Sequence, residues 1–247
     1  MLTKLVAVVG LAFGIFAIVV IAPRDALTRT HKDLAERLLL GGTFTGARWS
    51  LIEQAAADIE RLSAPGVWSG RLLIAVRARE FAIDEATPGA NVRARYDALV
   101  AAARAQIERF PDDGLAWFAL GYHQLRVVGA SPSAYAALAR SYVTVPGEWW
   151  LMRMRSPALL PILSDLRMPL RQQVFVEYAR LLGDGRLAEN VETFRMLDPA
   201  TRQMVMPLIM ELDERQREHF NAALRQAGDP QVIPLERHSN PRPWHRD

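Results

Sequence analysis

The sequence predicts an all-α protein in which an N-terminal transmembrane helix precedes a larger helical body. Residues 5–22 form an apolar run without a charge. At ~1.5 Å per residue, this run makes a helix of about 27 Å, close to the ~30 Å hydrocarbon core of a bilayer. Behind it, apolar residues recur at helical spacings of three and four, and turn signals fall roughly every 15 to 20 residues. No segment shows the period-two alternation of a half-buried strand.

A cleaved signal peptide is the alternative interpretation of residues 5–22. Signal peptides have an apolar core of ~7 to 15 residues, shorter than this run, and here Pro23 would follow the candidate cleavage site. We therefore predict a retained anchor. Gly10 and Gly14 form a G-x-x-x-G pair on one face of it, and such a face permits pairing with another membrane helix.

The orientation of the anchor rests on the length of the body. Positive residues flank the run on both sides, with Lys4 before it and Arg24 and Arg29 after it, so local charge does not fix the direction. Long C-terminal domains translocate largely regardless of charge. We expect the N-terminus in the cytoplasm and the body on the other side of the membrane.

Composition argues against nucleic-acid binding by the body. Half of the chain is apolar and the net charge is only +3. No basic run with interleaved aromatic residues occurs, so we expect no nucleic-acid partner.

The Pro-rich residues 228–247 predict a disordered tail, in which His238 and His245 are too isolated to predict a metal site.

The elements of the body are predicted from apolar faces and helix-start signals. Helices are expected over 25–40 and 92–109, and starts at Ser131-Pro132, Ser156-Pro157 and Met168-Pro169. Leu-Asp pairs at 197–198 and 212–213 predict two more starts, the second with a capping box from Asp213 to Gln216. The predicted buried faces are Leu51, Ala55, Ile59 and Leu62; Leu72, Leu73, Val76 and Phe81; Tyr96, Leu99, Ala103 and Ile107; and Leu187, Val191, Phe194 and Leu197.

One stretch carries a repeat signature. Trp117, Leu120 and Gly121 match the W-x-x-L-G pattern of the tetratricopeptide repeat. The glycine lets two backbones approach, and a second helix of the repeat would begin at Ser131-Pro132. Over about a third of its length the chain thus resembles tetratricopeptide-repeat proteins, although Gln124 stands where the pattern usually has Tyr. The resemblance implies a tetratricopeptide-like helical solenoid.

The wider layout resembles single-pass proteins encoded in proteobacterial exopolysaccharide biosynthesis clusters, on the basis of the anchor, the repeat region and the stretch from Arg140 to Trp150. That resemblance implies a bacterial inner-membrane protein with a periplasmic body. The expected divisions are an anchor over 1–24, leading helices over 25–65, repeats over 66–155, a helical region over 156–227 and the tail.

Two groups of residues are candidate contact surfaces. In the repeat family, the groove is lined by positions that here are Phe118, Tyr122, Leu125 and Arg126; the alternative is that following helices cover them as core. The second group is the segment 149–155, in which Trp149, Trp150, Arg153 and Arg155 offer aromatic and guanidinium contacts to a protein or a sugar ring, unless they too are core.

No motif for phosphate binding, nucleophilic catalysis or metal ligation occurs. Asp112 and Asp113 follow a helix-ending proline, where a helix cap is expected rather than an acid pair. We predict a non-enzymatic scaffold without a cofactor that holds a protein partner at the membrane. The alternatives are an assembly chaperone for another exported system and a glycan-modifying enzyme.

Overall fold

The computed structural model describes residues 22–62, 65–183, 187–231 and 233–234. All regular secondary structure within these ranges is helical, as the sequence predicts. None of the helices in this part of the chain is both long and apolar enough to cross a membrane. The predicted anchor, with Gly10 and Gly14, lies outside the described residues except for its last positions.

The chain divides into two compact units, Met1–Pro146 and Gly147–Asp247. The first unit contains helices α2 (Ala22–Leu39), α3 (Gly46–Arg61), α4 (Val67–Glu85), α5 (Val92–Arg109), α6 (Gly114–Val127) and α7 (Pro132–Thr144). The second contains α8 (Trp149–Leu159), the 3-10 helix η2 (Leu160–Asp165), α9 (Leu170–Gly183), α10 (Leu187–Arg195), α11 (Pro199–Met210) and α12 (Glu214–Gln226).

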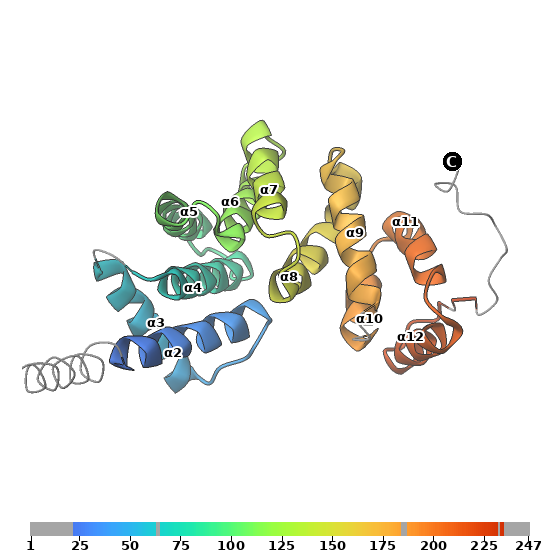
Figure 1. The fold of residues 1–247 in the computed structure, drawn as a ribbon, viewed down its shortest axis with the longest axis horizontal. Coiled ribbons are helices and arrows are strands. Elements are labelled where there is room, and N and C mark those ends of the chain that lie inside the picture. Colours follow the sequence, from blue (N-terminus) through green and yellow to red (C-terminus); the bar gives the residue numbers. More distant parts are fainter. Residues whose placement is uncertain (1–21, 63–64, 184–186, 232, 235–247) are drawn as a thin grey trace, which may run out of the picture. The chain divides into compact units, whose positions relative to one another are not determined.

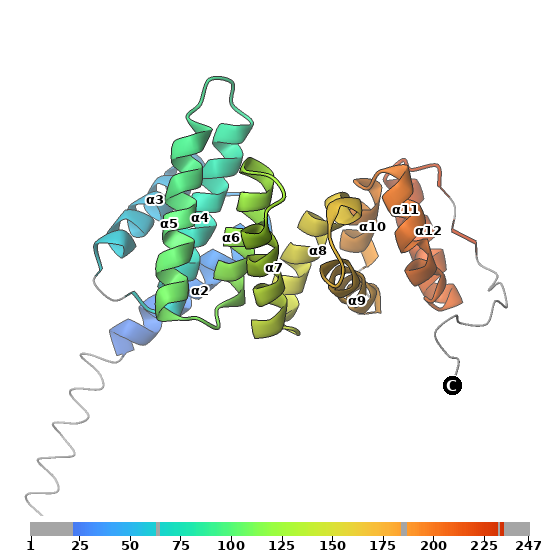
Figure 2. The ribbon, with the colours of Figure 1, turned by 90° about the horizontal axis from the view of Figure 1, so that it is seen from above.

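In the first unit, α4 packs against α2, α3 and α5, and then α5 against α6 and α6 against α7 (Figure 1). Figure 2 shows α4 and α5 side by side with a short connection at one end. A core of apolar side chains joins α2, α3 and α4, among them Ala35, Ile52 and Leu72. The arrangement is a stack of helices in which each one is covered mainly by its neighbours.

The predicted helix over 92–109 is confirmed at both ends. The predicted face of α3 is wrong in part, because Leu51 is 66% exposed and Leu62 is 49% exposed. The buried residues of α3 are Ile52, Ala56 and Ile59, a helical stripe rotated from the predicted one.

The second unit corrects one predicted helix start. Pro157 lies inside α8 rather than at the start of a helix. The preceding Ser156 does not cap a helix, because its hydroxyl donates a hydrogen bond to Glu177 of α9 at 3.1 Å. The expected division between 155 and 156 therefore falls within α8, while the structural division follows Pro146. The predicted capping box of Asp213 and Gln216 is confirmed.

Part of the predicted disordered tail is ordered. The Asn221 side chain of α12 forms two hydrogen bonds with the backbone of Ile233. Its amide nitrogen donates to the Ile233 carbonyl at 2.8 Å, and its oxygen accepts from the Ile233 amide at 2.7 Å. The Ile233 side chain is fully buried. Residues 235–247, which include His238 and His245, lie outside the described residues.

Candidate functional site

The α6–α7 pair is the part of the structure that carries the repeat signature. Asp113 caps α6 by accepting the Leu115 amide at 3.1 Å, and Ser131 caps α7 by accepting the Ala134 amide at 3.2 Å. Both caps agree with the sequence-based expectation. A side chain on Gly121 would place its Cβ 2.8 Å from the Ala134 carbonyl oxygen and from the Leu138 amide nitrogen. The two helices are therefore in backbone contact at this glycine.

The tryptophan and the leucine of the W-x-x-L-G pattern differ in burial. Leu120 is buried, whereas Trp117 is only half-buried. Its indole nitrogen donates to the Pro111 carbonyl at 2.8 Å. Trp117 thus connects the loop before α6 to the first turn of that helix by a hydrogen bond, and its ring is partly covered.

The predicted groove positions of α6 divide into buried and accessible residues. Phe118 is 5% exposed and therefore part of the core. Its ring stacks on Tyr122, with the ring centroids 5.4 Å apart. Tyr122 is half-buried, and the guanidinium of Arg126 lies 5.8 Å from the centre of its ring. Leu125 is half-buried as well. Tyr122, Leu125 and Arg126 are thus the accessible part of this group, and we call the aromatic and cationic pair, Tyr122 and Arg126, the α6 surface.

Arg126 is oriented by a contact with another helix. Its guanidinium donates to Glu85 of α4 at 2.7 Å, and both side chains remain substantially exposed to water. An exposed ion pair of this kind contributes little to stability. It does, however, hold the guanidinium over the Tyr122 ring, so that the aromatic and cationic groups are presented together.

His123 lies behind the α6 surface and not within it. The side chain is buried, its Nδ1 is 2.9 Å from the Ala119 carbonyl oxygen, and its ring meets Phe81 edge to face. Burial lowers the pKa of His123 to about 4, with the nearby Arg126 charge acting in the same direction. The imidazole is therefore neutral at physiological pH and functions as a packed core residue.

The second predicted group contains a buried ion pair. Arg155 is fully buried and pairs with Glu177 of α9, which also accepts the Ser156 hydroxyl. A partner cannot reach this guanidinium in the folded unit, so Arg155 does not belong to a contact surface. Sequence analysis missed its role because Glu177 lies 22 residues away along the chain, beyond any local charge pattern.

The rest of the segment is partly accessible. Trp149, Trp150 and Arg153 are half-buried. Arg153 forms a bidentate ion pair with Glu189 of α10, with nitrogen–oxygen distances of 2.7 and 2.6 Å. We call these three residues the α8 segment. The Arg153 side chain is 19% exposed, against 42% for Arg126, so the α8 segment is a weaker contact candidate than the α6 surface.

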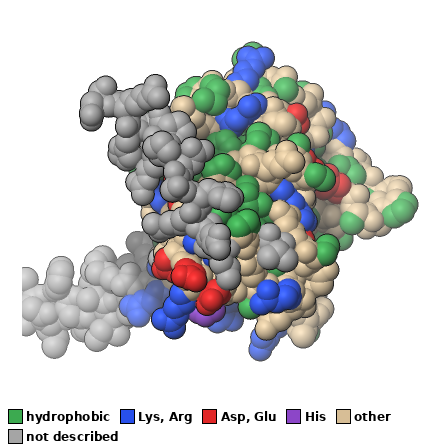
Figure 3. Space-filling view, turned by 90° about the vertical axis from the view of Figure 1, so that its right-hand side faces the viewer, with side chains coloured by type: hydrophobic (Ala, Val, Ile, Leu, Met, Phe, Trp, Pro, Cys, Tyr) green, Lys and Arg blue, Asp and Glu red, His purple; other side chains and the backbone are tan. Residues whose placement is uncertain are grey.

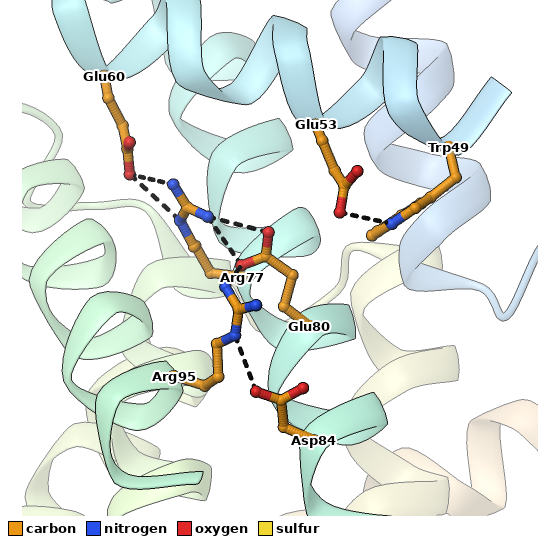
Figure 4. A network of polar contacts seen from close by, with 7 residues as sticks. All are labelled: Trp49, Glu53, Glu60, Arg77, Glu80, Asp84 and Arg95. Carbon is orange, nitrogen blue, oxygen red and sulfur yellow. Dashed lines mark hydrogen bonds and ion pairs between the residues drawn. The ribbon is translucent and has the colours of Figure 1, made fainter. Parts of the chain in front are cut away.

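A network of charged side chains ties α3, α4 and α5 together (Figure 4). Arg77 donates to Glu60 and to Glu80, and Arg95 donates to Glu80 at 3.2 Å and to Asp84 at 2.9 Å. Burial works to lower the pKa of Arg77, but its hydrogen bonds to the two glutamates raise it overall. Because arginine holds each of these carboxylates, none is presented as a free general acid or base.

Within the described ranges, no group of three or more His, Cys, Asp or Glu side chains is arranged to hold a metal ion. Figure 3 shows hydrophobic and basic side chains interspersed on one face of the molecule. In the second unit, Met168, Val176 and Met196 are each more than half exposed. Isolated apolar residues of this kind are common on protein surfaces and do not by themselves indicate a site.

No protein-family model, no curated protein and no solved structure matches this chain.

Proposed function

We propose that this chain is a membrane-anchored scaffold with a tetratricopeptide-like helical body, which holds a protein partner. The observation that carries the proposal is the α6 surface, where Tyr122 and Arg126 stand accessible on a helix fixed by backbone contact at Gly121. Aromatic and arginine side chains on a rigid element are typical anchors of protein interfaces. Stacked helical repeats use such surfaces for binding.

The tether and the setting rest on the sequence. The apolar run over 5–22 has the length of a membrane span. The layout resemblance is our reason for proposing a role in cell-envelope or exopolysaccharide assembly at the bacterial inner membrane. In this proposal the body is periplasmic and works within reach of the membrane.

Affinity capture with the full-length protein tests this function. We expect Tyr122→Ala and Arg126→Ala to reduce recovery of the partner strongly, because truncating a central aromatic or arginine anchor often costs ~2 kcal/mol or more. Arg153→Ala tests the α8 segment in the same assay. Each variant must retain the parental circular dichroism, since loss of fold also abolishes capture.

Arg93→Ala is the matched control. Like Arg126, Arg93 is an exposed arginine that pairs with a carboxylate, Asp97, and lies over a tyrosine ring, Tyr96, at 5.2 Å. We expect the control to capture the partner normally. If all three test variants capture as well as the parent, neither proposed surface is the binding site. If the purified protein turns over a glycan and one Asp or Glu substitution abolishes turnover, the protein is an enzyme.

A further inference from the structure

A hollow lies beside the turn between α2 and α3. It consists of two pockets that share Gly42 and Phe44 of the turn. Arg37 of α2 and Arg48 of α3 line one of them, and Trp49 of α3 with Arg79 and Ile83 of α4 lines the other. We call it the α2–α3 hollow. The turn closes tightly against α2, because Gly41 has a φ of +80° and the Gly42 amide donates to the Arg37 carbonyl at 2.7 Å. This tight reversal brings Phe44 back beside the helices.

The floor of the hollow is apolar. Phe44 and Trp49 are half-buried and pack against the core of α2, α3 and α4, yet they also line the hollow. Ile83 adds a side chain that is 45% exposed. The polar atom of Trp49 is already satisfied, since its indole nitrogen donates to Glu53 at 2.8 Å (Figure 4). Water is thus in contact with apolar surface here, and a ligand that covers it gains burial.

The rim is basic. Arg37, Arg48 and Arg79 each come from a different helix, and none of them pairs with a carboxylate among the described residues. Other arginines of this unit do have such partners, among them Arg71, Arg77, Arg95 and Arg126. Two acidic residues, Asp33 and Glu36, lie at one edge of the hollow, and Glu36 is 3.9 Å from Lys32. The unpaired guanidinium groups therefore outnumber the unpaired carboxylates.

We propose that the α2–α3 hollow binds an acidic segment of a protein partner. Carboxylates of that segment pair with Arg37, Arg48 and Arg79, since the planar guanidinium matches a carboxylate with two parallel hydrogen bonds. An apolar side chain of the same segment covers Phe44, Trp49 and Ile83. Arginine clusters with apolar anchor sites are a recurring means of recognising acidic motifs. The inference rests on the proposed scaffold role, because it takes the occupant to be a protein, and it specifies the chemistry of the contact.

Selection of binders from a library of random peptides, displayed against the full-length protein, tests the inference. We expect the selected peptides to be rich in Asp and Glu around an aliphatic or aromatic residue. A synthetic peptide of the selected sequence should lose about tenfold or more in affinity for the double variant Arg48→Gln, Arg79→Gln. Its binding to the parent should also weaken as salt is raised.

Arg104→Gln is the matched charge control. Arg104 is an exposed arginine of α5 with no carboxylate partner among the described residues, and it does not line the hollow. We expect it to bind the peptide like the parent. For the apolar floor, Ile83→Ser should weaken binding, while Val143→Ser, on an exposed valine of α7, should not.

Two results would overturn the inference. One is a set of selected peptides without acidic enrichment, or an equal affinity loss in the double variant and in Arg104→Gln. The other is a double variant that keeps peptide binding but loses binding to oligogalacturonate or to vesicles of anionic phospholipid, which assigns the hollow to a glycan or a lipid headgroup. The scaffold proposal is tested by a different experiment, partner capture by the Tyr122 and Arg126 variants, so the two proposals can fail independently.

Discussion

Gly121 is the residue at which α6 and α7 come closest. A Cβ there would lie 2.8 Å from two backbone atoms of α7 and from Cγ of Leu138. Backbone atoms cannot rotate away as a long side chain can, so any larger residue forces the two helices apart.

We expect Gly121→Ala to lower the free energy of unfolding by about 1–3 kcal/mol, as other overpacking changes do. Gly46→Ala is the matched control, because no atom lies within 4 Å of the Cβ that would be added at this first residue of α3. Urea denaturation of the two variants measures the difference. Equal stability of Gly121→Ala and the parent would show that the α6–α7 contact is not as close as described.

His123 links the stability of the first unit to pH. Burial lowers its pKa to about 4 from the ordinary 6.5, so between these values the unfolded chain binds a proton that the folded chain does not. Stability is therefore complete above pH 6.5 and falls as the pH drops toward 4. From these two pKa values, lowering the pH from 7 to 5 should cost about 2 kcal/mol through His123 alone.

The measurement is urea denaturation of the parent and of His123→Leu at both pH values. Burial also lowers the pKa of His31, whose Nδ1 lies 2.9 Å from the Ser69 hydroxyl. His31 is present in both proteins, so the difference between their pH dependences isolates His123. We expect a smaller pH dependence in the variant, and identical slopes would show that His123 does not titrate as described.

At the scale of the element, two aspartates perform the same capping task in different surroundings. Asp113 begins α6, is buried, and also accepts hydrogen bonds from Arg71 of α4 at 3.0 Å and from Gln106 of α5 at 2.6 Å. Asp213 caps α12 from an exposed position, and its side chain contacts, among the residues that the structure describes, the backbone of Gln216 within the capping box. The first cap therefore joins three helices, whereas the second serves one.

We expect Asp113→Ala to cost about 3 kcal/mol or more, because it removes both a cap and the buried carboxylate that accepts hydrogen bonds from Arg71 and Gln106. Asp213→Ala should cost about 1 kcal/mol, the usual value for an exposed cap. Thermal or urea unfolding of both variants gives the comparison. If the two substitutions prove equally costly, the buried contacts of Asp113 contribute nothing beyond capping.

Local patterns predicted many helix ends but not which side of a helix is buried. Asn91 caps the helix that was predicted over 92–109, and Ser131 and Asp213 cap two others; each signal lies within a few residues of its partner. Along α3, by contrast, apolar residues occur around much of the helix, so Leu51 fits a helical stripe as well as Ile52 does. Only the packing of α2 and α4 decides that Ile52 is covered.

Contacts between distant residues explain the remaining differences in the candidate sites. The sequence left Arg155 open as a contact residue or as core, and in the structure it is fully buried and paired with Glu177 on α9. The α2–α3 hollow was not predicted, because its arginines lie at positions 37, 48 and 79, on three helices. The α6 surface was predicted in part, since the family pattern names Tyr122 and Arg126 but does not show that Phe118 is covered.

At the scale of the whole molecule, the two units have separate cores. Ile52, Leu72 and Leu99 are buried in the first, and Tyr178, Phe194 and Phe220 are buried in the second. A chain segment with its own core and its own caps meets the requirements of an independent domain. We therefore expect residues 22–146 and 147–247, expressed separately, each to unfold cooperatively with the helicity of the corresponding part of the parent.

Substitutions placed in one unit provide the decisive check on this independence. Gly121→Ala should lower the melting temperature of fragment 22–146 and of one transition of the parent. Asn221→Ala removes both hydrogen bonds to Ile233. It should lower the melting temperature of fragment 147–247 and of the other transition of the parent, by an amount that corresponds to about 1–3 kcal/mol. Differential scanning calorimetry of the parent, the fragments and the variants resolves the two. If each substitution shifts all of the parent's unfolding together, or if a fragment fails to fold, the units stabilise one another and do not act as separate domains.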